Sequence, residues 1–541
     1  MPRRFIRLVL IVSVTLFCFV GILPAQERHP ASLSDDQTRA ILELLKEKGI
    51  ITEEEATAFM QRIRGPQIPA GGQPKLTGTE KTPKPEPATQ QDVAALQEKF
   101  ERTSGATMLD HRLLTRRIDD MEAGVLDQLV DKSIKSEWAQ RITISGDVRL
   151  RYQQDAFVDG NAIFVNPDDT SRVMNTTEDR HRFRYRARLG LKARLVDYRE
   201  INVGQVETGF RFTTGNEEDP VSTNDTMGDY FNRDSLVFDR AYLKWKWHPI
   251  NPWFDRMPQI SIVGGRFANP WFSTDLVWDG DLNFEGLAVS YETDTEQMRP
   301  MNLFFTAGVF PLQEEEFSNR DKWLWGAQVG LQYQPSYNMA FALSAAYYDY
   351  QNVEGIQNTL AYPNENNFTA PLYQQKGNTL MDIDPEDTIQ TALATDYNIL
   401  DILLKTDIGI FHPIHIILDA QYVKNFGFDA DRVAEVTGDD SPVEDTDGYM
   451  FGAMVGYPKI SNFGEWNVGL KYKYLGADAV LDAFTDSDFH LGGTNAKGWI
   501  LNCEYGLYRN LWLTARWLSS DEIKGPQFGV DTLQVDFNAR F

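Results

Sequence analysis

Between Arg141 and Phe541, apolar residues recur at every second position, which is the spacing of a β-strand with one apolar face. In segment 182–195 the apolar side chains, among them Phe183 and Leu189, alternate strictly with arginine, lysine and glycine. Runs of this kind predict sixteen strands, beginning near residues 142, 182, 201, 236, 259, 282, 302, 323, 339, 399, 414, 448, 465, 496, 510 and 530.

The predicted strands are joined alternately by short turns and by long loops. Short turns are expected at 197–200, 335–338 and 507–509, and longer acidic loops at, for example, 350–398 and 475–495. An even number of strands with turns on one side and loops on the other is typical of outer-membrane barrels. The sequence therefore predicts an all-β membrane protein, a 16-stranded antiparallel transmembrane β-barrel with an N-terminal helical periplasmic segment.

The region before the barrel has a different pattern and divides into four parts. Residues 1–25 combine a basic start with a short apolar run and read as a signal peptide for export to the bacterial outer membrane. Residues 26–64 carry helix caps and helical spacing, and residues 65–90 form a linker rich in Pro and Gly. Residues 91–139 again have helical spacing, as an oligomerising coiled coil or as a polar spacer. The barrel is expected over 140–541.

Charge and composition exclude several classes of function. The net charge of −25 becomes −28 when the three arginines of residues 1–25 are removed, which argues against nucleic acid as a partner. Cys503 is then the one remaining cysteine, so no disulfide or cysteine-based metal site is expected. The seven histidines lack metal-ligand spacing, and no nucleophile elbow or phosphate-binding loop is present. We therefore expect no cofactor, no metal and no enzymatic activity.

The last strand ends the chain with a distinctive pattern. Apolar residues occupy every second position from Leu533, including Phe537, and the final residue is Phe541. This ending resembles the C-terminal insertion signal of bacterial outer-membrane proteins. We expect the barrel-assembly machinery and outer-membrane lipid as partners.

Basic residues are concentrated in the first five predicted strands, at the alternate positions that face the inside of the predicted barrel. A midplane Arg or Lys facing lipid costs roughly 2–4 kcal/mol, so a set of this size is expected to line water. One interpretation is an electrostatic constriction that guides anions, and the other is a set of cations balanced by the acids of an infolded loop. The predicted basic wall consists of Arg149, Arg151, Arg182, Arg184, Arg186, Arg188, Lys192, Arg194, Arg211, Arg240, Lys244, Lys246 and Arg266.

Acidic residues in the predicted loops are candidate partners of this wall across the lumen. The alternative is that they belong to solvated external loops. The candidates for an acidic constriction are Glu217, Glu218, Asp219, Glu314, Glu315 and Glu316.

Several long stretches resemble the bacterial family of putative porins. They are 142–152 (ITISGDVRLRY), 216–233 (NEEDPVSTNDTMGDYFNR), 238–243 (FDRAYL) and 264–286 (GGRFANPWFSTDLVWDGDLNFEG). Segment 44–52 is similar to the N-terminal helices of that family. The resemblance implies a 16-stranded outer-membrane channel that forms a homotrimer, and it implies no catalytic residue.

The function expected from the sequence is passive diffusion of small hydrophilic solutes, anions among them, through a water-filled barrel with a basic wall. The competing hypothesis is a barrel plugged by residues 91–139 or by loop 350–398 that serves as an adhesin or envelope anchor.

Overall fold

The computed structural model describes residues 141–541 except 167–168, 197–203, 249–257, 294–299 and 387–388. The predicted signal peptide (1–25), helical segment (26–64), linker (65–90) and coiled coil (91–139) lie outside the described residues and remain predictions.

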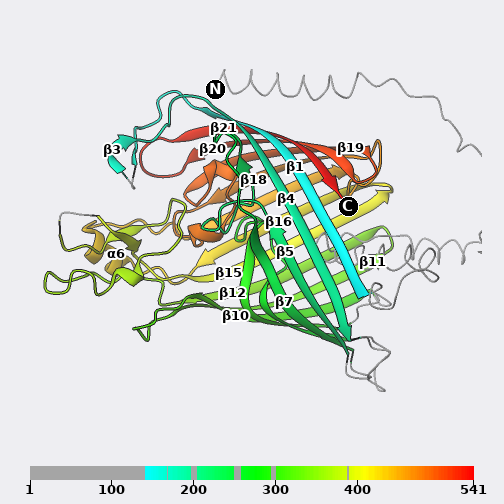
Figure 1. The fold of residues 1–541 in the computed structure, drawn as a ribbon, viewed down its shortest axis with the longest axis horizontal. Helices are drawn as coiled ribbons and strands as arrows, with labels where there is room; N and C mark the ends of the chain where they lie inside the picture. Colours follow the sequence, from blue (N-terminus) through cyan, green and yellow to red (C-terminus); the bar gives the residue numbers. More distant parts are fainter. Residues whose placement is uncertain (1–140, 167–168, 197–203, 249–257, 294–299, 387–388) are drawn as a thin grey trace, which may run out of the picture. The chain divides into compact units, whose positions relative to one another are not determined.

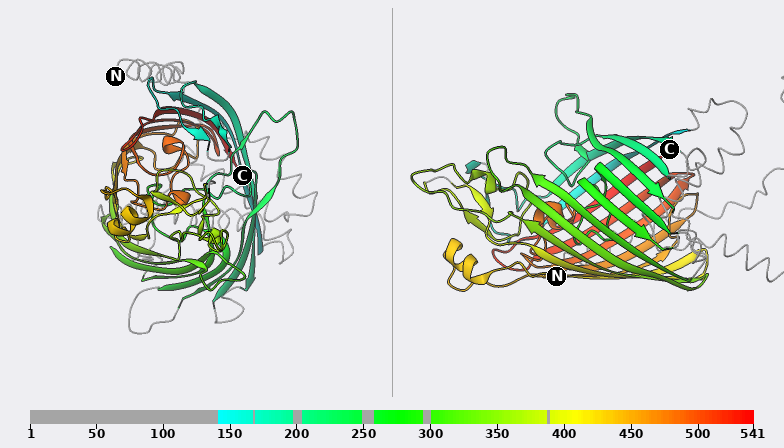
Figure 2. Two further views of the ribbon diagram at one scale, coloured as in Figure 1. Left: turned by 90° about the vertical axis from the view of Figure 1, so that its left-hand side faces the viewer. Right: turned by 90° about the horizontal axis from the view of Figure 1, so that it is seen from below.

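Sixteen long antiparallel strands form a closed barrel, as predicted (Figures 1 and 2). Each begins within a few residues of the position that the alternation predicts. The strands of the wall are β1 (Ile142–Phe157), β4 (Arg180–Val196), β5 (Gln205–Thr213), β7 (Val237–Trp247), β8 (Gln259–Ala268), β9 (Asn283–Glu292), β10 (Met301–Gln313), β11 (Lys322–Ser336), β12 (Met339–Gln351), β15 (Asn398–Phe411), β16 (Ile414–Asn425), β17 (Asp447–Gly456), β18 (Trp466–Leu475), β19 (Ala496–Tyr508), β20 (Leu511–Glu522) and β21 (Gly529–Arg540).

Each strand of the wall pairs with its neighbour in the sequence, and the first strand closes the barrel on the last. The register of β1 against β21 runs from Asp147↔Arg540 to Phe157↔Val530. At the end of this seam, the amide of Phe541 donates to the carbonyl of Gly146, and the amide of Gly146 donates to the carbonyl of Phe541, both at 3.0 Å. A barrel closed in this way leaves no free edge strand.

The connections alternate in length. Two residues join β11 to β12, β15 to β16 and β19 to β20 at one end, whereas the loops at the other end hold small elements of their own. None of the helices within the described ranges is long and apolar enough to cross a membrane. The loop elements are β2 (Val165–Asn166), β3 (Asp169–Val173), β6 (Asp225–Thr226), β13 (Leu380–Asp382), β14 (Thr391–Leu393), the helix α6 (Ala430–Thr437), and the 3-10 helices η2 (Asn367–Thr369), η3 (Asp482–Phe484) and η4 (Phe489–Leu491).

Strand β1 extends further toward the long loops than the apolar alternation indicates. The apolar alternation of this strand ends at Tyr152, but the structure continues the strand to Phe157. The additional residues of β1 include polar side chains that face inward. Gln153 donates to Asp155 at 2.8 Å, and Thr532 of β21 donates to the same carboxylate at 3.1 Å. Inward polar pairs extend the strand where the sequence lacks an apolar face.

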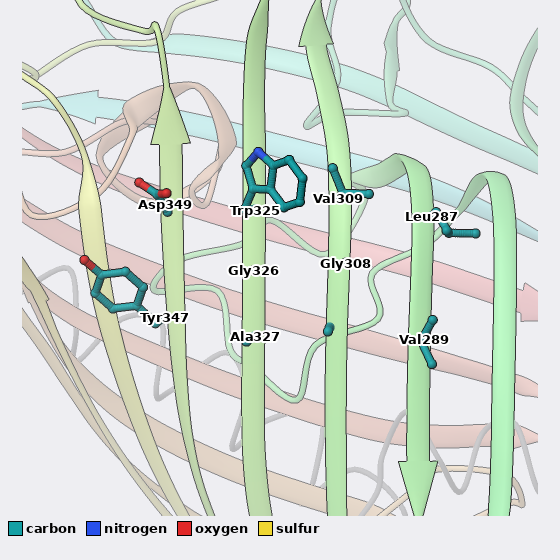
Figure 3. A pocket seen from close by; sticks show the side chains of 10 residues that line it. Leu287, Val289, Gly308, Val309, Trp325, Gly326, Ala327, Tyr347 and Asp349 are labelled. Atoms are coloured by element: carbon teal, nitrogen blue, oxygen red, sulfur yellow. The ribbon is translucent and has the colours of Figure 1, made fainter.

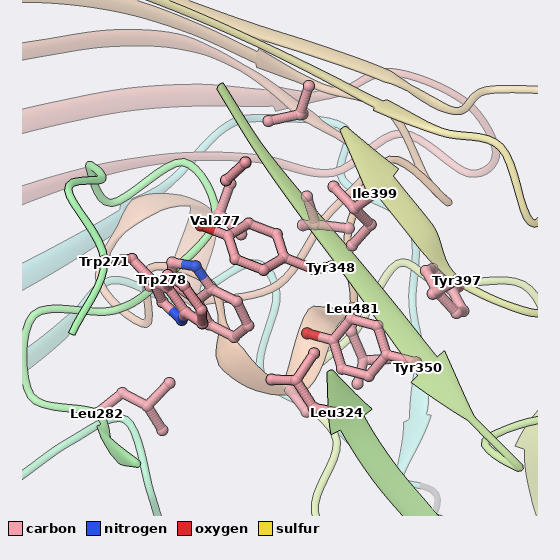
Figure 4. Packing of buried hydrophobic residues seen from close by; sticks show 14 of the residues in the cluster. Trp271, Val277, Trp278, Leu282, Leu324, Tyr348, Tyr350, Tyr397, Ile399 and Leu481 are labelled. Atoms are coloured by element: carbon pink, nitrogen blue, oxygen red, sulfur yellow. The ribbon is translucent and has the colours of Figure 1, made fainter. Parts of the chain in front are cut away.

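The outer face carries apolar side chains and the interior is filled partly by loops. Figure 2, left, shows loop segments inside the ring of strands. Loop 269–282, between β8 and β9, and loop 476–495, between β18 and β19, bring Trp271, Leu276, Trp278 and Leu481 into one buried cluster with the inward face of β9–β12 and β15 (Figure 4). The lumen therefore has an apolar side on which these loops rest.

Candidate functional site

The basic wall stands on the strand pair β1–β4. In the register of this pair, Arg149 lies opposite Arg186, Arg151 opposite Arg184, and Asp147 opposite Arg188. Directly opposed residues of an antiparallel pair have Cβ atoms about 5 Å apart, so like charges placed there repel each other. This row of arginines on β1 and β4, the arginine ladder, therefore needs carboxylates beside it.

Aspartates of the wall itself supply part of this compensation. Asp147 accepts from Arg186 Nη2 at 2.9 Å and from Arg188 Nε at 2.7 Å. Asp536 of β21 accepts from Arg151 Nε at 2.7 Å and from its Nη2 at 2.9 Å. Paired, nearly parallel hydrogen bonds of this kind hold the guanidinium plane in one orientation.

Further pairs compensate the wall above and beside the ladder. Arg182 donates to Asp155 at 2.8 Å, and Arg211 Nε donates to both oxygens of Asp239 at 2.9 Å. Lys246 lies 3.3 Å from Glu207. The wall thus carries acids on the same parity as its cations.

Two aspartates on the infolded loops complete the compensation from inside the lumen. Asp281 of loop 269–282 lies 3.3 Å from Arg186 Nη1 and 3.2 Å from Arg188 Nη1. It also accepts from the Thr223 hydroxyl at 2.9 Å. Burial alone would raise the pKa of the Asp281 carboxyl, but the guanidinium groups of Arg186 and Arg188 hold it below its usual range.

The second loop aspartate is Asp488 of loop 476–495. It accepts from Arg151 Nη1 at 3.2 Å, from Arg516 Nη1 at 2.8 Å and from Gln534 Nε2 at 2.8 Å. Burial acts to raise the pKa of this carboxyl, and Arg151 and Arg516 outweigh that effect and lower it. Asp281 and Asp488 are therefore anions that fasten two loops to the basic wall.

Arg184 is placed differently from its neighbours in the ladder. Its Nη2 donates to the Ser222 hydroxyl and to the Asn224 carbonyl, each at 3.2 Å, and its Nε has no hydrogen-bond partner among the described residues. The partners are uncharged, so Arg184 keeps its charge uncompensated by a direct carboxylate contact.

Several side chains of this charged zone are not fully buried. The side chains of Arg149, Arg188 and Arg516 remain 20%, 19% and 20% exposed, and Asp488 remains 19% exposed, although all lie within the barrel. The ion pairs between the wall and the two loops therefore form one partly exposed cluster of fixed charges inside the barrel.

The path of loop 269–282 is set by contacts with the opposite wall. Trp271 lies flat over Gly326 of β11, where an added Cβ would come within 2.6 Å of the indole. Phe272, which follows Trp271, is held by the side-chain amide of Gln328. This amide accepts from the Phe272 N–H and donates to the Phe272 carbonyl, each at 2.8 Å. A glycine and an amide side chain on β11 thus position the loop that carries Asp281.

Loop 476–495 rests on loop 269–282. The Thr485 hydroxyl donates to the Leu276 carbonyl at 3.0 Å, and the Ser487 N–H donates to Asp279 at 2.9 Å. Lys473 of β18 donates to the Asp275 carbonyl at 3.3 Å and lies over the ring of Phe489. The two loops form one unit inside the barrel.

Of the predicted wall, Arg266 is an exception and corrects the prediction. Its neighbours in sequence and register, Phe267 and Phe284, point into the buried cluster, so Arg266 and its ion-pair partner Glu285, 2.7 Å away, project from the outer face. The pairing of β8 with β7 and β9 has no register shift here, so alternation alone gives Arg266 the parity of Ile260 and Ile262. In the registers of β1, β4, β5 and β7 the remaining predicted cations share one face of the sheet, the face that also carries Asp147, and their role in lining a pore stays a prediction: Arg149, Arg151, Arg182, Arg184, Arg186, Arg188, Lys192, Arg194, Arg211, Arg240, Lys244 and Lys246.

The acidic partners of the ladder differ from those predicted. Asp219 accepts from the Tyr373 hydroxyl at 3.2 Å and from the backbone of its own turn. Glu217 and Glu218 are exposed, and Glu314, Glu315 and Glu316 follow the end of β10. The alternation could have indicated Asp147 and Asp536, which share the inward parity. Asp281 and Asp488 carry no such signal, because the path of a loop through the lumen is a tertiary property.

Within the described ranges, no three side chains of His, Cys, Asp or Glu gather in a way that would hold a metal ion.

None of the curated proteins compared matches the sequence. Similar solved structures include the outer membrane channel DcaP of Acinetobacter baumannii, with 13% identity, a TM-score of 0.38, and coverage of 74% of this chain and 97% of that one. Pseudomonas putida OprB has 10% identity and a TM-score of 0.43, covering 77% and 97%. A loop-deletion mutant of the Vibrio cholerae outer membrane protein OmpT has 11% identity and a TM-score of 0.39, covering 74% and 100%.

The family model described as "Putative porin" matches residues 35–541, which is most of the chain. The chain belongs to the putative porin family.

Proposed function

We propose that the protein is an outer-membrane diffusion channel for small hydrophilic solutes, with its constriction between the arginines of β1–β4 and the loop carboxylates Asp281 and Asp488. The observation that carries this proposal is the charged zone itself, where partly exposed cations and anions face one another inside a closed barrel. Fixed charges that line water suit passage of polar solutes, and they include no catalytic arrangement.

The ion preference proposed for this channel is modest. Direct carboxylate contacts compensate Arg151, Arg186 and Arg188, which favours the interpretation of a wall balanced by an infolded loop. Arg184 lacks such a contact, which favours some preference for anions. The field of these fixed charges would orient dipolar solutes as they pass.

Single-channel recording in planar bilayers tests the pore. Purified full-length protein is expected to give stepwise, ohmic conductance. The convergence of loops 269–282 and 476–495 inside the lumen is the observation in favour of the second candidate, a plugged barrel that acts as an adhesin or anchor. A complete absence of conductance steps, with the barrel correctly folded, would support that candidate instead.

The reversal potential in a salt gradient tests the constriction. Neutralising Arg184, Arg186 and Arg188 together, as glutamines, is expected to move the reversal potential toward cation preference. A triple change of Lys192, Lys244 and Lys246 to glutamine is the matched control, because these cations lie closer to the short-turn end of the strands. If both triple variants behave like the wild type, the constriction lies elsewhere.

Export and assembly are also part of the proposal. Residues 1–25 are proposed to be removed during export, and the family resemblance supports a homotrimer. Mass spectrometry of the protein from outer membranes, first denatured and then native, would test the N-terminus and the number of chains.

A further inference from the structure

The wall of the barrel is split between β9 and β10 at the long-loop end. These strands pair from Phe304↔Glu292 to Val309↔Leu287. Beyond that point, residues 283–286 of β9 continue to pair with β8, and residues 310–313 of β10 continue to pair with β11. Both strands extend past their last mutual pair, so the split lies within the height of the wall.

The residues at the split explain why the pairing ends there. Pro311 has no N–H to donate to a neighbouring strand. Gly286, with φ 140°, approaches β10 so closely that an added Cβ would lie 2.2 Å from the carbonyl oxygen of Val309. The last close contact between the two strands thus needs glycine at position 286. Two residues beyond Val309, Pro311 cannot continue the hydrogen-bonded pairing.

A cavity of about 650 Å³ occupies the split. Phe284 and Glu285 line it from β9, and Phe310, Pro311 and Leu312 line it from β10. From inside the barrel it is lined by apolar side chains of the loop unit, which Figure 4 shows gathered beside Leu324: Trp278, Leu282 and Leu481. The inner side of the split is therefore mostly apolar, whereas its edges also carry polar side chains, among them Glu285 and Gln313.

An apolar groove of about 450 Å³ leads to the split along the outer face of the barrel (Figure 3). Small residues form its floor, among them Ala307 and Ala327, which lie opposite each other on β10 and β11. Trp325 flanks it on one side. Leu287 and Val309 line the groove, and Glu285 and Phe310, two positions and one position further toward the long loops, line the cavity, so the two lie close together along the same pair of strands.

A buried cation stands at the inner end of this path. Lys322 lines the cavity and is 6% exposed, and its Nζ donates to the carbonyls of Thr369 at 3.1 Å and Ala370 at 2.9 Å. At the opposite rim, Arg266 pairs with Glu285, and its Nε has no hydrogen-bond partner among the described residues. The other acids that line the cavity are Glu217 and Glu218, which are exposed to solvent, and Asp482, whose pKa is raised by burial to about 7. A desolvated ammonium held by neutral carbonyls favours an anion beside it.

We propose that the split is a lateral binding site for a single-chain anionic amphiphile, such as an alkyl carboxylate, drawn from the lipid around the barrel. The alkyl chain lies in the outer groove between Leu287 and Trp325, and the head group enters the split toward Lys322. This site is additional to the central pore and takes a class of molecule that a hydrated constriction does not.

Quenching of tryptophan fluorescence tests the position of the chain. Full-length protein in phosphatidylcholine vesicles is titrated with a fatty acid brominated along its chain, since bromine quenches a tryptophan that it contacts. We expect a saturable component that disappears when Trp325 is changed to phenylalanine. The change Ala327→Phe fills the groove and is expected to abolish the same component.

Ala453→Phe is the matched control for the groove. Ala453 of β17 also faces outward, opposite Leu418 and Leu470, away from the split. It is expected to retain saturable quenching, and both phenylalanine variants are expected to keep the wild-type conductance, which separates this site from the pore. Equal quenching in Ala327→Phe and Ala453→Phe, or quenching that rises without saturation in the wild type, would overturn the proposal.

The head group is tested with Lys322→Gln, whose amide still donates to the carbonyls of Thr369 and Ala370. We expect the affinity for the brominated carboxylate to fall about tenfold, as for loss of a charge-assisted hydrogen bond. The affinity for the brominated alcohol of the same length is expected to stay unchanged. Equal losses for carboxylate and alcohol would show that Lys322 only supports the loop, and the anionic part of the proposal would fail.

Discussion

At the scale of single residues, the charged zone shows how a membrane barrel tolerates a ladder of arginines. A guanidinium offers five N–H donors in a fixed plane, so one arginine can bind two carboxylates at once. Arg186 does this with Asp147 and Asp281, and Arg151 does it with Asp536 and Asp488. Each cation is thus shared between the wall and a loop, and its charge positions both.

Removing one of the loop carboxylates should affect stability and permeation together. We expect Asp281→Asn to lower the free energy of unfolding by about 3 kcal/mol, because it leaves Arg186 and Arg188 short of a buried partner. The lost negative charge should also move the reversal potential toward anion preference. Denaturant unfolding and bilayer recording measure the two effects.

Asp439→Asn, in an exposed loop, is the control for this change. It removes the same charge from the chain without touching the ladder, so neither measurement should move. An Asp281→Asn protein with wild-type stability and selectivity would contradict the role given to this carboxylate.

Gly326 provides a second prediction, since the indole of Trp271 occupies the place of a side chain there. We expect Gly326→Ala to cost roughly 1–3 kcal/mol through overpacking and to change the single-channel conductance by displacing loop 269–282. Gly280→Ala, in the same loop but with no atom within 4 Å of the added Cβ, should leave the conductance unchanged. Identical behaviour of the two variants would argue against the packing account.

At the scale of elements, residues Gln375 and Asn378 of the loop between β12 and β15 bind loop 476–495. The Gln375 N–H donates to Asp482 at 3.1 Å, and its side-chain amide donates to the carbonyls of Asp482 at 2.8 Å and Thr485 at 3.0 Å. Asn378 donates to the carbonyls of Ala477 at 2.7 Å and Val480 at 2.9 Å. Backbone groups of two loops are thus satisfied by amide side chains rather than by a sheet.

The contact between these loops should depend on pH. Burial raises the pKa of Asp482 to about 7, from an ordinary value of 3.8. The stabilisation by this group is therefore fully present below about pH 4 and is lost as the pH rises through 7, when the buried carboxyl must ionise. We expect hydrogen exchange at the Gln375 amide, relative to Asp482→Asn, to increase between pH 5 and pH 8.

Asp482→Asn keeps the hydrogen-bond acceptor and removes the titration, so it also corrects for the intrinsic pH dependence of exchange. If the ratio of exchange rates between wild type and variant stays constant over this range, the carboxyl does not control the contact.

At the scale of the whole molecule, the final residue belongs to the closure of the barrel. Phe541 makes both backbone hydrogen bonds with Gly146, and its ring lies against the place where a Cβ of that glycine would be. We expect deletion of Phe541 to slow assembly into the heat-modifiable, folded form on electrophoresis, whereas Phe541→Tyr should assemble normally. Equal assembly of both variants would show that the terminal residue has no part in insertion or closure.

The sequence predicts the barrel well because a strand through a membrane must alternate. The sixteen strands, their order and the shared face of most cations follow from a period of two, which depends only on neighbouring residues. The inward prediction for Arg266 is wrong: β8 pairs with β7 and β9 without a register shift, and simple alternation gives Arg266 the opposite parity to Ser261 and Val263, which pair with Lys246 and Lys244. Asp281 and Asp488 could not be predicted as partners of the arginines, because the local sequence of a loop does not determine which part of the barrel wall the loop contacts.

The seam between β1 and β21 has a consequence for how the barrel is made. Arg151 lies at the start of the barrel sequence, and its carboxylate partner Asp536 arrives with the last strand, 385 residues later. Until β21 docks, the inner face of β1 holds a cation whose wall partner is missing, beside the cations of β4. Docking of the last strand therefore neutralises charge and satisfies backbone groups in a single event. An unfinished barrel therefore differs from a finished one in its charge balance as well as in its shape.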